Sequence, residues 1–100
     1  MQKHIGSFRD AWLAAFFMYS TPHRNIPAEI HNTLARKLDI INAATSYLDL
    51  RSPPGNRFEA LSGKLQGYSS IRVNHHYRLI FRWVEGKAED LYLDPHDYRM

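Results

Sequence analysis

The stretch GYSSIRVNHHYRLIFRW, residues 67–83, decides how the rest of this chain can fold. Two runs of β-forming residues flank the polar triplet at 74–76, which predicts a β-hairpin with a three-residue loop. Such a loop sets Arg72 opposite Arg78, and side chains then alternate between the two faces of the sheet. One face is apolar and carries Ile71, Val73, Tyr77, Leu79, Phe81 and Trp83. The other carries Tyr68, Ser70, Arg72, Arg78, Ile80 and Arg82. Its three arginines make it the candidate functional surface.

A further strand is predicted at residues 88–94, after a turn. A two-residue turn would place Asp90 in the core opposite Phe81, where burial of a carboxylate is costly. A three-residue turn at 85–87 instead places Leu91 opposite Phe81, so we expect that register. It pairs Arg82 with Asp90, Ile80 with Tyr92 and Arg78 with Asp94, and it brings His96 out on the same polar face.

Two amphipathic helices are predicted before these strands. Apolar residues recur at helical spacing at Phe8, Trp12, Leu13, Phe16 and Phe17, and again at Ile30, Leu34, Leu38 and Ile41 after Pro27. The second helix should end near residue 44. Its outer face carries Arg36 and Lys37, which either contact a polyanion or form an ordinary solvated surface. The fold class that follows is α+β, with two N-terminal helices packed on one face of a mainly antiparallel sheet.

Shorter segments complete the predicted order. Residues 3–8 can form an edge strand, and residues 57–61 a short strand. Residues 49–56 contain two prolines followed by a glycine, which predicts a shaped loop without regular structure. The sequence contains no repeat or internal linker, so we expect a single domain that spans residues 1–100.

Composition narrows the classes of function. The chain has 100 residues, a net charge of +3, a pI near 9.4 and no cysteine. The absence of cysteine excludes disulfides and thiolate metal sites and favours a cytoplasmic location. No apolar run reaches the roughly 18 residues needed to span a bilayer, so we expect no membrane role. The positive charge favours an anionic partner.

The spacing of the residues gives little support for a metal site or for a catalytic serine. None of the six histidines forms a helical pair at i and i+4, so we expect neither a metal nor another cofactor. Ser70, Asp94 and His96 can be drawn as a catalytic triad. However, no nucleophile elbow surrounds the serine, and we set this chemistry aside.

A phosphate-directed site accounts better for the arginines. Guanidinium groups can hold a scissile phosphodiester and stabilise the charge that develops on it. Metal-independent RNA cleavage then needs a base for the 2′-hydroxyl and an acid for the leaving oxygen, which histidine, tyrosine or lysine can supply. The groups available are Arg72, Arg78, Arg82, Tyr68, Lys64 and His96. The alternative is that the arginines form only cross-strand ion pairs, Arg78 with Asp94 and Arg82 with Asp90.

Several motifs carry a family resemblance that covers nearly the whole chain: DLRSPPGNR at 49–57, LSG at 61–63, GYSSIRVN at 67–74 and YRLIF at 77–81. Together they resemble the HigB branch of the RelE toxin superfamily. The resemblance implies a bacterial type II toxin that enters the ribosomal A site and cuts translated mRNA. It also implies neutralisation by a helix-turn-helix HigA antitoxin, through which alone the toxin would meet operator DNA.

The resemblance also implies roles for single residues. The arginine of the family's Arg-Leu strand matches Arg78, to which we assign phosphate binding, with Arg72 beside it. The family's Asp-Tyr-His ending resembles residues 94–96, with proline in place of tyrosine. The Glu-Asp-Tyr-His ending of other members resembles residues 96–99, with arginine in place of the final histidine, so His96 and Tyr98 are both candidates for the acid or base. The candidate RNA contacts are Lys64, Tyr68, Arg82, Arg36 and Lys37. The alternative function is a non-catalytic RNA-binding or antitoxin-binding module of the same fold.

Overall fold

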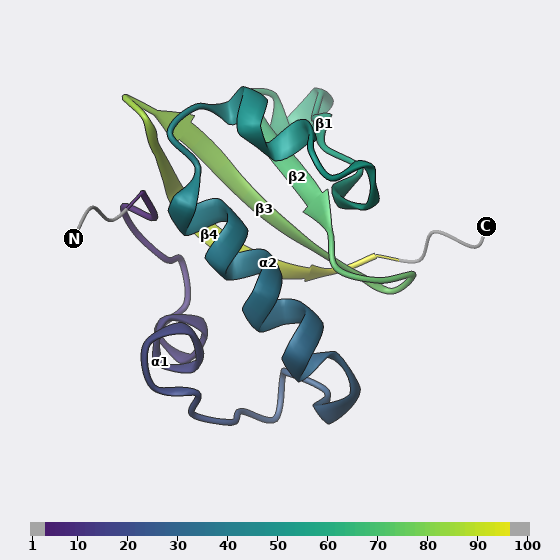
Figure 1. Ribbon diagram of the computed structural model, residues 1–100. Coiled ribbons are helices and arrows are strands. Elements are labelled where there is room, and N and C mark those ends of the chain that lie inside the picture. The colour runs from purple at the N-terminus through teal and green to yellow at the C-terminus, as the bar shows by residue number, and fades with distance from the viewer. Residues whose placement is uncertain (1–3, 97–100) are drawn as a thin grey trace.

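The computed structural model describes residues 4–96, which form a four-stranded antiparallel sheet with two helices on one face (Figure 1). The helices are α1 (Ala11–Tyr19) and α2 (His31–Ala43). The strands are β1 (Glu59–Ala60), β2 (Tyr68–Arg72), β3 (Tyr77–Val84) and β4 (Lys87–Pro95), adjacent in that order. Within this range, short 3-10 turns form at Ala28–Ile30, Tyr47–Arg51, Pro54–Asn56 and Gly63–Leu65. The predicted α+β fold class is confirmed.

One hydrophobic core joins both helices to the sheet. It contains Leu13 and Phe16 from α1, Leu34, Leu38 and Ile41 from α2, and Ile71, Leu79 and Phe81 from the sheet. The predicted apolar stripe of α2 is therefore confirmed, and this helix ends at Ala43, beside the predicted position. No helix within residues 4–96 is long and apolar enough to cross a membrane.

Strands β2 and β3 form the predicted hairpin. Arg72 pairs with Arg78, which is the register that a three-residue loop requires. The amide of Val73 donates to the carbonyl oxygen of Tyr77 at 2.9 Å and closes the loop. The two predicted faces are therefore correctly assigned.

The N-terminal segment lies along the edge of β4 (Figure 1). Ile5 and Phe8 form parallel bridges with Ala88 and Leu91. The predicted edge strand is thus present as two isolated bridges. Because this segment leads directly into α1, the pairing fixes where the first helix begins.

The turn between β3 and β4 differs from our prediction. It has two residues, Glu85 and Gly86, with φ angles of 51° and 80°, instead of three. In a regular ladder a two-residue turn buries the Asp90 carboxylate, but a β-bulge in β4 prevents this. Asp90 takes a φ angle of 56°, and the ladder shifts by one residue there. Since a bulge inserts an unpaired residue, Leu91 still reaches the core.

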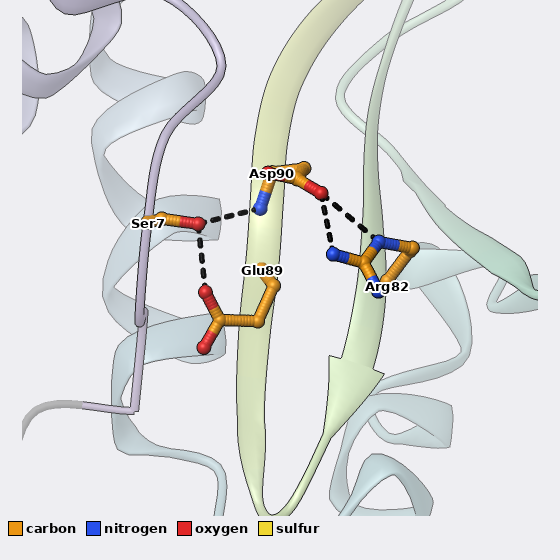
Figure 2. Close-up of polar contacts among 4 residues, drawn as sticks. All are labelled: Ser7, Arg82, Glu89 and Asp90. Carbon is orange, nitrogen blue, oxygen red and sulfur yellow. Dashed lines mark hydrogen bonds and ion pairs between the residues drawn. The ribbon is translucent and has the colours of Figure 1, made fainter.

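Ser7 holds this bulge in place (Figure 2). Its Oγ accepts a hydrogen bond from the Asp90 amide at 2.9 Å and donates one to Glu89 Oε1 at 2.7 Å. The ladder consequently pairs Arg82 with Glu89, whereas we predicted that Arg82 would pair with Asp90. The Asp90 carboxylate still reaches the Arg82 side chain. Beyond the bulge the predicted register of β3 and β4 is confirmed.

The loop at residues 49–56 is more regular than predicted. It contains parts of two 3-10 turns, separated by a cis peptide bond between Ser52 and Pro53. Ser46 and Asp49 form a capping box that starts the first turn, and Leu50 anchors it in the core. Local capping and one buried side chain therefore provide order that the proline-glycine content does not indicate.

Lys37 is buried, whereas we predicted it on the outer face of α2. Its side chain is 5% exposed, and Nζ donates to Asn56 Oδ1 at 2.6 Å. Lysine can cover apolar surface with its stem while its ammonium group reaches a polar partner. Burial, together with the charge of the neighbouring Arg36, lowers the pKa of Lys37. The two residues of α2 that we paired as RNA contacts are therefore in different environments.

Candidate functional site

The candidate site lies on the face of the sheet opposite the helices. This surface, termed the arginine face, consists of Tyr68, Arg72, Arg78, Arg82 and Tyr92. The ladder places Arg72 beside Arg78 and Tyr68 beside Arg82, as predicted. Two residues at the centre of this face, Ser70 and Ile80, are buried. The arginine face thus consists of polar and aromatic side chains that surround, and cover, two buried residues.

Arg78 is held by a cross-strand ion pair. Its Nε lies 2.9 Å from Asp94 Oδ2, and its side chain is 14% exposed. This is the only hydrogen bond of the Arg78 side chain to another residue within 4–96. A guanidinium carries five N–H donors, so a single bond through Nε leaves the terminal nitrogens able to bind an anion. Asp94 therefore orients Arg78 without using its capacity to bind phosphate.

Arg82 is held more tightly by its carboxylate. Both Nε and Nη2 bond to Asp90 Oδ2, at 3.0 Å and 2.6 Å (Figure 2). These hydrogen bonds, and then the charge of Asp90, raise the pKa of Arg82. The guanidinium also lies 6.0 Å from the centre of the Tyr68 ring. Both cross-strand ion pairs that we considered as the alternative are thus present.

A fourth arginine reaches this face from the N-terminal segment. The Cζ of Arg9 lies 3.8 Å from the centre of the Tyr92 ring, and Nη2 lies 2.8 Å from Asp10 Oδ2. Burial, and then the charge of Asp94, raises the pKa of Tyr92, so this phenol stays protonated at neutral pH. The place of Arg9 could not be predicted from the sequence, because it depends on the parallel pairing of the N-terminal segment with β4.

His96 continues the β-pairing past the end of β4. Its amide donates to the His76 carbonyl oxygen at 2.7 Å. With Pro27, Glu29, His76, Tyr77 and Pro95, it lines a hollow of about 480 Å³. Among residues 4–96, no arginine lines this hollow, which lies at the end of the sheet near the start of α2. Tyr98, the other candidate acid or base, lies outside the described residues.

The remaining predicted contacts are spread over the molecule. Tyr68 and Arg82 belong to the arginine face, and Lys64 is exposed in the 3-10 turn that precedes β2. Arg36 is exposed on α2, on the other side of the sheet, and Lys37 is buried as described above. Within residues 4–96, no group of three or more histidine, aspartate or glutamate side chains could hold a metal ion.

The fold and the arginine face define a small basic α+β protein with a surface suited to phosphate groups. Residues 6–96 match the family model described as RelE-like toxin of type II toxin-antitoxin system HigB. The chain is also 57% identical over 91 residues to Toxin HigB-1 of Vibrio cholerae serotype O1, which covers 91% of this chain and 96% of that protein. An uncharacterized protein of Haemophilus influenzae is 46% identical over 93 residues, covering 93% of this chain and 92% of its own.

The chain therefore belongs to the HigB-like toxin family. It is a toxin of a type II toxin–antitoxin system, and membership of such a system implies an antitoxin partner. The family predicted from the motifs in the loop at 49–57 and in the central hairpin is confirmed.

Proposed function

We propose that this toxin is a metal-independent endoribonuclease that cuts mRNA in the ribosomal A site while the message is being translated. The observation that carries the proposal is the opposition of Arg72 and Arg78 on one open sheet face, with Arg82 on the same face. Such a cluster can bind a phosphodiester and stabilise the negative charge that develops during cleavage. A HigA-like helix-turn-helix antitoxin would neutralise the toxin and mediate any contact with operator DNA.

Roles for single residues follow from this chemistry. Arg78 would bind the scissile phosphate, and Arg72 would stabilise its developing charge. Either His96 or Tyr98 would take the proton from the 2′-hydroxyl or give one to the leaving oxygen. Tyr68, Arg82, Lys64 and Arg36 remain candidate contacts to the RNA. Lys37 is withdrawn from this set because its ammonium group is buried against Asn56.

Induction of the toxin without its antitoxin tests the proposal. Growth should stop, and a reporter mRNA should be cut within its reading frame. A matched reporter whose start codon is removed should stay intact, because it does not enter the ribosome as a translated message. Efficient cleavage of that second reporter, or of purified RNA alone, would contradict dependence on the ribosome.

A second candidate function is supported by the ion pairs of Arg78 and Arg82. Arginines that are already paired with carboxylates can serve a binding surface without any catalysis. In that case the protein is a non-catalytic RNA-binding or antitoxin-binding module, and induction should slow translation without producing cut ends. Mapping of mRNA 5′ ends after induction separates the two functions.

A further inference from the structure

A second basic and aromatic surface lies away from the arginine face, in the loop between α2 and β1. We define this loop patch as Tyr47, Arg51, Arg57 and Phe58. The rings of Tyr47 and Phe58 are stacked, with centres 6.1 Å apart and planes inclined by 28°. Tyr47 is 45% exposed, while Phe58 packs partly against the core. The patch therefore exposes an aromatic ring, Tyr47, that is stacked on a second ring packed against the core.

The loop that carries this patch is stabilised by hydrogen bonds of Asn56, whose side chain is fully buried. Its Nδ2 donates to the carbonyl oxygens of Leu50 and Ser52, at 3.1 Å and 3.3 Å. Its Oδ1 accepts the 2.6 Å hydrogen bond from Lys37. A buried network in which each polar group has a partner gives rigidity. Arg51 and Arg57, on either side of this network, are consequently held in fixed backbone positions.

The charges of the loop patch are not neutralised within the described chain. Arg51 and Arg57 are exposed, and neither forms an ion pair with any residue in 4–96. The nearby Asp49 carboxylate instead accepts hydrogen bonds from Thr45 and Ser46, which lower its pKa. This differs from Arg78 and Arg82 on the arginine face, which are both paired with aspartate.

Arg57 also has an unusual backbone conformation. Its φ and ψ angles of 48° and 49° lie in the left-handed region, which residues with a side chain rarely adopt. Such a conformation persists only where the surrounding structure imposes it, and it is concentrated at functional sites. Here it directs the chain from the turn Pro54–Asn56 into β1 and places Arg57 at the rim of a hollow.

That hollow has a basic and partly aromatic lining. It measures about 400 Å³ and is lined by Arg51, Pro54, Arg57, Phe58 and Ala60. We propose that the loop patch binds single-stranded RNA, with a phosphate between Arg51 and Arg57 and a base stacked on the aromatic pair. Basic grooves that present aromatic rings bind single strands in this way, with little dependence on sequence. The identification of RNA as the natural ligand of the loop patch rests on the function proposed above. The ability of the loop patch to bind a single strand does not depend on that function.

The test measures binding of a fluorescent oligouridine of about 12 nucleotides to the full-length toxin, separated from its antitoxin, over a range of salt. The double variant Arg51→Glu with Arg57→Glu should bind at least about tenfold more weakly, because both arginine contacts to the phosphate are lost. For single strands each neutralised phosphate contributes about 0.7 to the slope of log affinity against log salt, so the slope should fall by about 0.7.

Two further variants complete the design. Arg24→Glu with Lys87→Glu makes the same change of net charge at two exposed residues outside the patch, and should keep the wild-type salt slope. Tyr47→Ala should weaken binding about five- to 150-fold through lost stacking, without changing the slope. Circular dichroism melting curves should agree for all four proteins, since every substituted side chain is exposed.

Equal affinity and equal salt slope for the two double variants would overturn the proposal. So would a loop variant that keeps its RNA affinity but loses the antitoxin, because the patch would then be a protein-binding surface. Cleavage on programmed ribosomes is measured separately. A wild-type toxin that binds RNA through the loop patch but cuts nothing would refute the proposed nuclease and leave this second site standing.

Discussion

Arg78 and Leu79 are neighbours in β3 whose side chains lie on opposite faces of the sheet. Arg78→Ala should abolish toxicity and leave the fold intact, because it removes a charge-assisted phosphate contact by a residue outside the hydrophobic core. Such a contact is worth about 1.5–3 kcal/mol, or about a ten- to hundredfold change in rate. Single-turnover cleavage on programmed ribosomes measures the loss.

Leu79→Ala is the matched control for the same strand. Leu79 is fully buried, so its truncation should lower the free energy of unfolding by about 2–5 kcal/mol. Urea unfolding measures this change. If Arg78→Ala retained full activity, the ion pair with Asp94 would be structural only, and the nuclease role of the arginine face would be refuted.

His96 and Tyr98 compete for the role of acid or base. Both imidazole and phenol side chains can exchange a proton with a reacting group, which general acid–base catalysis requires. If His96 has this role, His96→Gln should slow single-turnover cleavage by about two to four orders of magnitude and barely change ribosome binding. If Tyr98 has it, Tyr98→Phe should give that loss and His96→Gln should not. Wild-type rates for both variants would reject both candidates.

The elements differ in how far local sequence determines them. The hairpin of β2 and β3 could be predicted because the length of its loop sets its register. The bulge of β4 could not, because the group that satisfies the Asp90 amide belongs to Ser7, 83 positions earlier in the chain. The same limit applies to Lys37, whose burial depends on Asn56 in a loop that follows the helix.

Removal of the Ser7 hydroxyl tests how much the bulge depends on it. Ser7→Ala leaves the Asp90 amide without its acceptor and Glu89 without its donor (Figure 2). The free energy of unfolding should fall by about 1–3 kcal/mol. Thermal or urea unfolding measures this, with Ser62→Ala as control, since Ser62 is exposed and makes no capping hydrogen bond through its side chain. Equal losses in the two variants would mean that the bulge forms without Ser7.

At the scale of the whole molecule, both helices lie on one face of the sheet and leave the arginine face open (Figure 1). The fold class and the pairing of Arg72 with Arg78 could be predicted from alternation along two strands. The contribution of Arg9 and the ordered loop patch could not, because each depends on segments that meet only in the folded chain. Alternation along the strands therefore predicts which residues form the arginine face. It does not predict the contacts that residues from distant segments make with it or elsewhere on the surface.

The free energy of unfolding of the whole molecule should depend on pH through the ionisation of Lys37. Burial lowers its pKa below the ordinary value of 10.5, so between these two values the unfolded chain binds more protons than the folded one. The free energy of unfolding should therefore rise as the pH increases through that window. This contribution should be least favourable below the folded pKa, where the buried group is charged.

Lys37→Met keeps the unbranched side chain and removes the ammonium group, so this variant should lose the rise with pH. Urea unfolding from about pH 7 to about pH 10 measures the difference between the two proteins, below the range in which Tyr92, with its raised pKa, titrates. Lys64→Met removes an exposed ammonium group and should retain the wild-type profile. Parallel profiles for the wild type and Lys37→Met would show that Lys37 is solvated, and that Asn56 alone holds the loop.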